Sequence, residues 1–550
     1  MDPRQQKVNI APARKEPWWA FPISVHQEAA GTRISIAWRR MALQLLGLAA
    51  CGWLLLVCSV FLWVKYYRGF SDVQFTNILL PHRWKEYSTA RGNFYIKQAK
   101  EEIAAQKWVD AIHHLRVGVA AAPSNTEGRL ILAQFFTLFG RIELAKRTLV
   151  EGVPFGKDDP EYLKALFGFL LQYQEDDEIR RIAAEQLPPA PSIDNRTQLI
   201  ALAAATANFY RGAYDAAEAL IEDYRLLGTK DGRMLQVRID WERGNRDLAL
   251  QRLGQFIAAA PDDDDFYSQL VTFNRELGRL DLVAKYALLR ELANPKSAAA
   301  RIDLLLAYRM NGNDTKYRES AASILRDFPD DRTTLLALAN FGTEHGDAEL
   351  ALRVFRHLKE HNLETDAAGL MVAEAYIVAG QHQAALDFLL ELGRSRPEWL
   401  QKFLGIVNGL QAVACYGLGQ REDGDLYLTH FLAQPNIRAE HLTAISNRLI
   451  AVGAKTEARR VLLQAVTADT RNQNALTRLC QLDLERSPSD ELIANLRRLI
   501  AMRRPSSEVL QLARRRLASD RFLFVAGRDE LLASIQATLA RSPVPVIPAS

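Results

Sequence analysis

Cysteine is scarce in this chain: there are four among 550 residues, and no two have the C-x-x-C spacing of a redox motif or a zinc site. Cys51 and Cys58 lie in a long apolar run, and Cys415 and Cys480 stand alone. A chain of this length can bury a large core without disulfides, so the low cysteine content gives no indication of the compartment.

An excess of charge of one sign is also missing. Lysine and arginine total 69 and aspartate and glutamate total 65, which leaves a net charge of +4. Proteins that bind nucleic acid usually carry a basic stripe, so this balance argues against that class of partner. Apolar residues make up 48% of the chain and charged residues 24%, which are ordinary values for a folded protein.

No catalytic or metal-binding motif is complete. Residues 152–158 resemble a phosphate-binding loop, but the spacing is one residue short and Asp158 replaces the hydroxyl that the loop needs. His357 and His361 are four residues apart, but the sequence offers no third ligand, so a solvent-exposed pair is expected. The sequence therefore predicts a binding protein and not an enzyme, with no cofactor and no metal.

One long run without charge is present at residues 41–64, MALQLLGLAACGWLLLVCSVFLWV. As a helix with a rise of about 1.5 Å per residue it would be roughly 36 Å long, enough to cross a bilayer core. Trp38 precedes the run, and Trp63, Tyr66 and Tyr67 lie at its other end, as in an interfacial aromatic belt. The run predicts a single transmembrane helix.

Two other interpretations of this run are less favoured. Residues 48–51 resemble a lipoprotein cleavage box, but the apolar run continues beyond Cys51, where a mature lipoprotein would turn polar. A cleaved signal peptide is disfavoured because the run is long, begins 40 residues into the chain and lacks a polar cleavage region.

The charged residues before the run are mainly basic. The basic side chains are Arg4, Lys7, Arg14, Lys15, Arg33, Arg39 and Arg40, and the acidic ones are Asp2, Glu16 and Glu28. The positive-inside rule predicts a cytoplasmic N-terminus, with the rest of the chain across the membrane. In a bacterium this means the inner membrane and a periplasmic repeat domain.

Glycine recurs with a fixed step in the long remainder of the chain. Five glycines follow one another at intervals of 34 residues: Gly244, Gly278, Gly312, Gly346 and Gly380. Three prolines keep the same step: Pro261, Pro295 and Pro329. A constant period of this length predicts a stack of two-helix units, each packed on its neighbours, which frees a long chain from the size limit of one compact core.

The unit from 366 to 399 resembles the tetratricopeptide repeat (TPR). The residues that carry the resemblance are Ala373 at the small-residue position, Tyr376 at the aromatic position, Gly380 at the turn, Ala385 in helix B and Pro397 after it. A left-handed backbone is expected at the turn glycine. The resemblance implies an all-α, TPR-like α-solenoid, a right-handed superhelix of helix pairs.

The repeats depart from the pattern in several places. Residues 160–191 and 472–505 lack the glycine, and Tyr317 and Gly424 stand where helix B usually has alanine. The step from Gly380 to Gly419 is 39, so five extra residues enter near 396–405. The predicted segments are an N-terminal tail at 1–40, a transmembrane helix at 41–64, a linker or cap at 65–91, about twelve repeat units at 92–505, capping helices at 506–541 and a disordered tail at 542–550.

The resemblance also implies a binding surface, because helix A of a TPR unit lines the concave groove. Carried onto this sequence, groove positions include Arg238, Trp241, Arg275, Arg309, Asn340 and Glu374. Trp241, Arg275 and Arg309 would form a ladder suited to a peptide carboxylate or an acidic segment. The alternative is a solvated or internally paired inner face.

A second basic region lies near the C-terminus. It contains Arg497, Arg498, Arg503, Arg504, Arg514, Arg515, Arg516 and Arg521, and nearby carboxylates dilute its charge. A solvated helix face is favoured here over a docking site for anionic lipid or an acidic partner.

These features predict a membrane-anchored scaffold that binds a protein partner, in a bacterial envelope assembly. The alternative is an accessory or regulatory subunit of a membrane enzyme or of a polysaccharide export system. A glycan-binding arm should expose several aromatic side chains, and the predicted groove offers mainly Trp241.

Overall fold

The structure is a computed structural model. It describes residues 22–28, 31–36, 38–188, 190–435, 437–486 and 489–540. The chain divides into two compact units, Met1–Phe169 and Leu170–Ser550, and each is described by itself. The start of the predicted N-terminal tail and the predicted tail at 542–550 lie outside the described residues.

A small hairpin comes first. Strands β1 (Ile23–Glu28) and β2 (Gly31–Ile36) pair antiparallel, from Ile23 opposite Ile36 to Glu28 opposite Gly31. The sequence analysis placed only a tail here and did not predict strands. The hairpin precedes the repeats, so it does not change their fold class.

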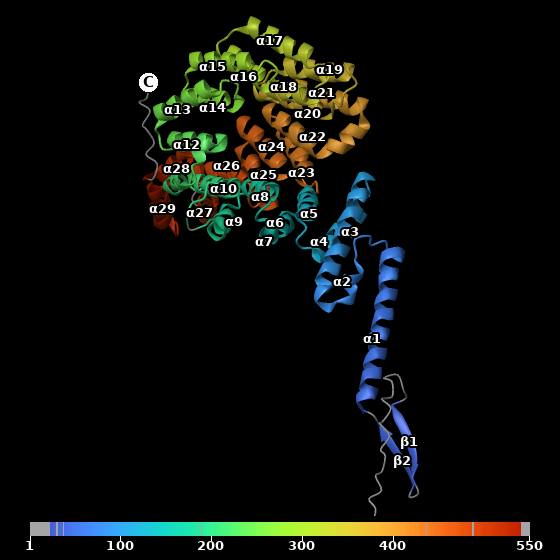
Figure 1. Cartoon of the computed structure of the whole chain (residues 1–550). Helices are drawn as coiled ribbons and strands as arrows, with labels where there is room; N and C mark the ends of the chain where they lie inside the picture. The colour runs from blue at the N-terminus through green and yellow to red at the C-terminus, as the bar shows by residue number, and fades with distance from the viewer. Residues whose placement is uncertain are drawn as a thin grey trace, which may run out of the picture. The chain divides into compact units, whose positions relative to one another are not determined.

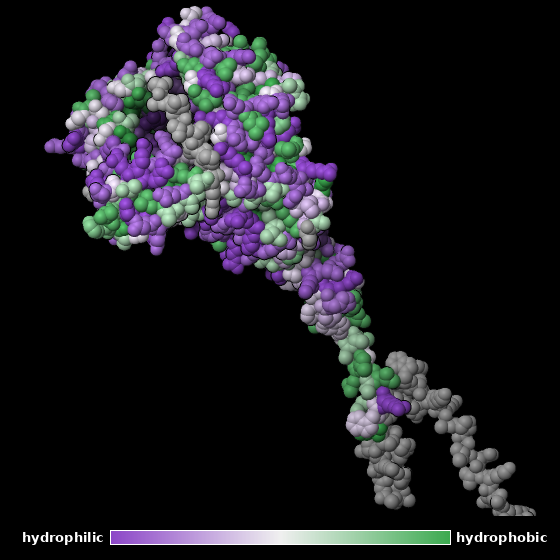
Figure 2. All heavy atoms as spheres, turned by 90° about the vertical axis from the view of Figure 1, so that its left-hand side faces the viewer, coloured by the Kyte–Doolittle hydropathy of each residue, from purple (hydrophilic) through white to green (hydrophobic). Residues whose placement is uncertain are grey.

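Helix α1 (Trp38–Leu62) continues through a π-helical turn, η1 (Trp63–Tyr67). Within it, Met41–Tyr67 is a helix of 27 residues that is long and apolar enough to cross a membrane, and the predicted span at 41–64 lies inside it. Figure 2 shows apolar side chains gathered on this narrow part of the molecule, whereas the visible face of the helix pairs is largely hydrophilic.

The segment after α1 folds back along its C-terminal half. The ring of Phe75, in α2 (Phe75–Leu79), lies 5.6 Å from that of Phe61, and Trp53 Nε1 donates a hydrogen bond of 3.3 Å to the carbonyl of Leu79. Val57 is buried, whereas most of the N-terminal half of α1 is exposed. The segment that contains α2 therefore packs against the C-terminal half of α1.

Antiparallel helix pairs follow, beginning at Trp84 and so earlier than the predicted residue 92. In the first unit they are α3 (Trp84–Ala104) with α4 (Trp108–Ala121), α5 (Thr126–Leu138) with α6 (Ile142–Val150), and, after the short α7 (Val153–Gly156), α8 (Pro160–Gln172), which runs into the second unit. The 3₁₀ turn η2 (Pro81–Arg83) leads into α3.

The second unit continues the series (Figure 1). Its helices are α9 (Asp176–Gln186), α10 (Asn195–Tyr210), α11 (Tyr214–Asp223), α12 (Lys230–Glu242), α13 (Arg246–Ala259), α14 (Asp264–Glu276), α15 (Leu280–Ala293), α16 (Ala298–Met310), α17 (Asp314–Asp327), α18 (Arg332–Glu344), α19 (Ala348–Glu360), α20 (Asp366–Val378), α21 (His382–Ser395), α22 (Pro397–Gly417), α23 (Arg421–Leu432), α24 (Ala439–Ala451), α25 (Lys455–Ala468), α26 (Gln473–Glu485), α27 (Asp490–Met502), α28 (Ser507–Leu517) and α29 (Arg528–Ala540). The even-numbered members from α10 onward are the A helices.

The periodic glycines lie at the turns between paired helices, with φ between +65° and +87° at Gly244, Gly278, Gly312, Gly346 and Gly380. At Gly380 the turn satisfies two helix-end carbonyls, because its N–H donates to Ile377 O and the N–H of Gln381 donates to Tyr376 O. This confirms the predicted left-handed turn.

Each departure from the pattern has a local structural reason. Tyr317 is buried, and its hydroxyl donates to Asp347 of the next unit over 2.6 Å. At Gly424 a Cβ would lie 3.1 Å from the ring of Tyr416. The five extra residues lengthen helix A, because α22 has 21 residues and α20 has 13.

The core repeats with the same period as the turns. Ala249, Val283, Tyr317, Ala351 and Ala385 lie 34 residues apart in successive B helices, and all are buried. The alanines at three of these positions allow the paired helices to approach closely. Together with the helix lengths and the turns, this confirms the all-α, TPR-like α-solenoid predicted from the sequence.

Candidate functional site

The predicted groove residues lie on A helices, but in different surroundings. Arg238, Arg275, Arg309 and Asn340 are exposed, Glu374 is partly buried, and Trp241 is buried. The described contacts do not join Trp241, Arg275 and Arg309 into one ladder.

Trp241 is a correction to the sequence analysis, because it is a packing residue and not a groove residue. Its ring stacks on Phe273 with centroids 3.7 Å apart, and its side chain is only 9% exposed. Its Nε1 donates to Glu276 over 3.0 Å, and Arg246 lies over the ring. The period places Trp241 correctly on an A helix, but Phe273 in the next A helix covers its ring.

Three other predicted groove residues are paired internally. Arg309 donates to the carbonyl of His345 over 2.7 Å, and Asn340 donates to Glu344 over 2.9 Å. Glu374 accepts a hydrogen bond of 2.9 Å from Arg448, which lies on α24. For these residues the internally paired alternative is the better description.

The side chains of Arg238 and Arg275 have no hydrogen bond or ion pair with another described residue. Burial raises the pKa of Asp303, and the charges of Arg290 and Arg275 act in the opposite direction. The charge of Arg275 therefore interacts with that of Asp303. Among the predicted groove residues, Arg238 is the cation with the fewest interactions.

The two ends of the second unit are joined by a contact that we call the closure seam. Its two sides are residues 171–214, from the end of α8 to the start of α11, and residues 471–504, from α26 and α27 with the segments beside them. Arg503 donates to both carboxylate oxygens of Asp176, each over 2.9 Å, and to the carbonyl of Leu171 over 2.7 Å. The Asp176 side chain is 1% exposed and that of Arg503 is 14% exposed, so the ion pair is buried.

Further contacts extend the closure seam. The guanidinium of Arg503 lies 3.8 Å from the centroid of the Tyr210 ring, and the backbone N–H of Arg504 donates to Tyr210 O over 3.0 Å. The Arg504 side chain donates to Tyr214 Oη over 2.6 Å, and Arg211 donates to the carbonyls of Ala501 and Met502. In Figure 1, α9 and α10 lie beside α27 and α28, as these contacts require.

The sequence analysis missed the closure seam. It placed Arg503 and Arg504 in a solvated basic face, which is wrong for these two residues because both side chains are largely buried. The sequence clue was Arg503-Arg504-Pro505 directly after a helix, because proline stops the helix and frees two long cations to reach other elements. The partner Asp176 could not be identified from a periodic pattern.

A cavity of about 710 Å³ lies beside the closure seam. Its lining includes Gln172, Tyr173, Gln174, Glu440, Asn447, Asp469, Asn474 and Arg503. Burial raises the pKa of Tyr173, and the charges of Glu440 and Asp469 add to the rise. The site therefore offers side-chain amides, carboxylates and one aromatic ring.

Gln174 is the unusual residue of this cavity. Its φ is +59°, in a unit that lacks the turn glycine, and its Oε1 is buried without a hydrogen bond. A left-handed backbone costs a non-glycine residue roughly 1–2 kcal/mol. The left-handed backbone belongs to the turn between α8 and α9, whose N–H of Glu175 donates to Leu170 O as in the glycine turns.

A smaller cavity, of about 270 Å³, lies between the ends of α20, α22 and α24, next to Arg448 and His382. His382 packs against Gly417, where a Cβ would lie 2.4 Å from the imidazole. Burial lowers the pKa of His382, and its Nδ1 has no hydrogen bond. Burial therefore favours the neutral imidazole of His382 in the folded chain.

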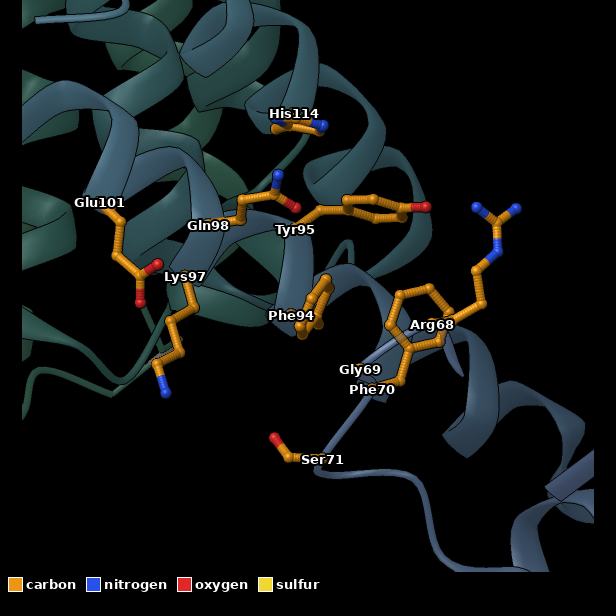
Figure 3. Close-up of a pocket in the computed structure, with 10 residues that line it drawn as sticks. All are labelled: Arg68, Gly69, Phe70, Ser71, Phe94, Tyr95, Lys97, Gln98, Glu101 and His114. Atoms are coloured by element: carbon orange, nitrogen blue, oxygen red, sulfur yellow. The ribbon is translucent and has the colours of Figure 1, made fainter. Parts of the chain in front are cut away.

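The first unit has a cavity of about 650 Å³ where η1 meets α3 and α4 (Figure 3). Phe70 and Phe94 line it, with ring centroids 4.8 Å apart, and Tyr95 stacks on His114. His114 Nδ1 lies 2.8 Å from Glu102. In Figure 3, Arg68 and Lys97 extend in different directions, so they do not converge on one ligand position.

The His357 and His361 pair is not arranged as a metal site. The rings stack, His357 Nε2 donates to Pro329 O over 2.9 Å, and His361 Nδ1 lies 2.9 Å from Asp330 Oδ1. Among the described residues, no group of three or more histidine, cysteine, aspartate or glutamate side chains could hold a metal ion.

Comparisons with known proteins find likeness in structure alone. No family model and no curated protein matches the chain. Among solved structures, the type IV pilus biogenesis factor PilW has 15% identity and a TM-score of 0.26, with 45% of this chain and 98% of PilW covered. Yeast Tom70 has 11% identity and a TM-score of 0.29, with 83% and 97% covered.

A TPR protein from Parabacteroides merdae has 14% identity and a TM-score of 0.27, with 46% of this chain and 96% of that protein covered. At these identities and TM-scores we base no argument on the likeness. The helices, turns and core of the chain itself show the fold.

Proposed function

We propose that this chain is a membrane-anchored scaffold, with α1 as the anchor and the A-helix face of the second unit as the binding surface for a protein partner. The observation that carries the proposal is the 34-residue helix stack, which leaves Arg238 and Arg275 exposed on successive A helices. Neither side chain has a hydrogen bond or ion pair with another described residue, although the charge of Arg275 also acts on Asp303. A cation without an internal partner can bind a partner's carboxylate without breaking an existing contact.

The proposed partner is a protein that presents an extended or acidic segment. Such a segment would meet Arg238 on α12 and Arg275 on α14, and the remaining predicted residues, Arg309, Asn340 and Glu374, would border its path. Tethering at a membrane raises the local concentration of the partner, so recruitment needs no chemistry from the scaffold.

The proposed location is a bacterial inner membrane, in an envelope assembly. The basic N-terminal residues favour a cytoplasmic N-terminus and a periplasmic repeat domain. Protease added to spheroplasts tests this topology, because cleavage of the repeat domain is expected only if it lies outside the membrane. Protection of that domain would reverse the proposed orientation.

Site-specific photocrosslinking in native membranes tests the binding surface. A photoreactive residue at position 238 or 275 should crosslink the partner, whereas one at position 390, an exposed leucine on the B helix α21, should not. The double change R238E/R275E should abolish the crosslink from a third A-helix position, 340. Equal crosslinking by the position 390 control, or full retention by the double variant, would contradict the proposed surface.

The second candidate function is an accessory or regulatory subunit of a membrane enzyme or of a polysaccharide export system. The cavity beside the closure seam favours it, because side-chain amides and carboxylates can both donate to and accept from the hydroxyl groups of a glycan. Purification in mild detergent separates the two candidates. A stable protein complex supports the scaffold, and a chain that retains glycan without a protein partner supports the alternative.

A further inference from the structure

The arginines near the C-terminus divide into two groups. Most have an internal partner: Arg497 pairs with Glu530, Arg498 donates to Thr470 O, Arg503 and Arg504 are in the closure seam, and Arg528 pairs with Asp529. The side chains of Arg514, Arg515, Arg516 and Arg521 are exposed and have no hydrogen bond or ion pair with another described residue.

The four unpaired arginines are close in sequence to an exposed apolar turn. The turn between α28 and α29 presents Phe524, which is 94% exposed, and Leu523, which is 52% exposed. A phenylalanine this exposed has almost no contact with its own chain, which is uncommon on the surface of a soluble domain unless it marks an interaction site.

The turn is held firmly at both ends, so the exposure of Phe524 is a property of the fold. Phe522 is buried, and the N–H of Leu523 donates to Asp520 O. Arg528 Nε donates to Leu517 O over 2.7 Å and joins the end of the turn to α28. A rigid turn can present a ring to a partner at a lower entropy cost than a mobile one.

We propose that this turn docks on an anionic lipid surface, with Phe524 and Leu523 inserted at the interface and the four arginines next to lipid phosphates. The inference rests on the proposed membrane anchoring, because a chain with its own span holds its other domain within reach of a bilayer. An apolar turn close in sequence to unpaired cations is the combination that interfacial segments use.

The chemistry favours lipid over an acidic protein as the occupant. Asp520 is the only carboxylate between Arg514 and Leu523. The next carboxylates along the chain, Asp529 and Glu530, are paired with Arg528 and Arg497, so the four unpaired arginines leave an excess of positive charge on this segment. Each arginine at an anionic surface increases the affinity roughly five-fold. A single protruding aromatic ring is suited to a fluid interface, whereas a protein partner would need a fitted pocket for it.

The test uses the full chain in nanodiscs made with or without phosphatidylglycerol. An environment-sensitive fluorophore is attached at F524C in a C51S/C58S background, where the remaining Cys415 and Cys480 are buried. The label should become shielded from aqueous iodide only in the anionic discs. The same label at L390C, on an exposed face of α21, is the matched control and should stay accessible in both discs.

The variant R514Q/R515Q/R516Q/R521Q should lose the shielding at position 524, because all four side chains are exposed and the fold does not need their charge. Equal accessibility of position 524 in both discs would overturn the inference. Shielding that is absent in lipid but appears when the soluble cell fraction is added would assign the turn to a protein partner instead.

Failure of the proposed anchoring gives a different result. If α1 is not an anchor, the chain will not co-elute with nanodiscs of either composition, and both proposals fall together. Co-elution with an accessible label at position 524 contradicts the lipid-docking inference alone.

Discussion

The regular stack from α12 to α21 and the closure seam hold the second unit together in different ways. In the stack, neighbouring helices bury small apolar residues such as Ala249, Ala351 and Ala385, and each contact joins elements close in sequence. In the seam, Arg503 and Asp176 join positions 327 residues apart through a buried ion pair.

The apolar contacts of the stack and the buried ion pair of the seam should differ in how well they tolerate substitution. Apolar contacts repeated along a solenoid add roughly unit by unit, so one substitution weakens the stack locally. A buried charge needs its specific partner, because an unpaired ion in the interior carries a large desolvation penalty. The seam should therefore be more sensitive to a single substitution than the apolar contacts of the stack.

The largest effect is expected from R503A. It leaves Asp176 buried without its cation, which should destabilise the seam by about 3–5 kcal/mol. Hydrogen exchange of the full chain in detergent should accelerate in α9, α10, α27 and α28 and stay unchanged in α14 to α19. R516A, an exposed and unpaired arginine, is the control, and uniform acceleration across the unit would contradict a local seam.

A smaller effect is expected from G346A in the regular stack. Gly346 has φ of +65°, and a Cβ there would lie 3.1 Å from the backbone nitrogen of Ala379. The left-handed backbone alone should cost about 1–2 kcal/mol, measured as faster hydrogen exchange in α18 to α20.

Gly254 provides the matched control for the glycine turn. It lies inside α13 in ordinary helical conformation with open space around its Cα. G254A should stabilise that helix by about 0.5–1 kcal/mol. If both alanine variants shift stability in the same direction, the turn conformation is not the reason that glycine recurs.

Acid should weaken the contact of α21 with α22 and α24 through His382. Burial lowers the pKa of this histidine in the folded chain, so the unfolded chain binds the proton more readily. Stability is therefore complete above the unfolded pKa of about 6.5 and declines as the pH falls below it.

The variant H382Q checks this pH dependence. Between about pH 7 and pH 5, exchange in α21 should rise more in the natural chain than in H382Q, because glutamine does not titrate. Parallel pH profiles for the two chains would show that His382 does not control the acid sensitivity.

The smallest effect on stability is expected from R238A and R275A. Both side chains are exposed and unpaired, so each change should alter the free energy of unfolding by less than about 0.5 kcal/mol. Partner crosslinking should nevertheless fall. A variant that loses stability instead would indicate a structural role, and the binding proposal for that residue would fail.

Much of the architecture was predictable from the sequence, because the period, the turn glycines and the small helix B residues are all local. The apolar span was predictable for the same reason, since its length and composition are read from consecutive residues. The packing of α2 against α1 was not predictable. It depends on how Phe75 and Leu79 contact Phe61 and Trp53 after the chain reverses direction.

The groove prediction shows the limit of a periodic pattern. The period gave the right helices for Arg238, Trp241 and Arg275, but exposure depends on what the neighbouring unit places opposite each residue. Phe273 covers Trp241, and no comparable side chain covers Arg275.

The sequence by itself determined that this chain is a helical repeat stack with one apolar helix near its start, because both features follow from spacing and composition along the chain. Only the tertiary structure decided that the second unit closes through Arg503 and Asp176, that Trp241 is core, that Phe524 protrudes, and that the arginines shortly before it in the chain are unpaired. Those properties depend on which residues distant in sequence contact one another in space, and a repeat period along the chain does not specify such contacts.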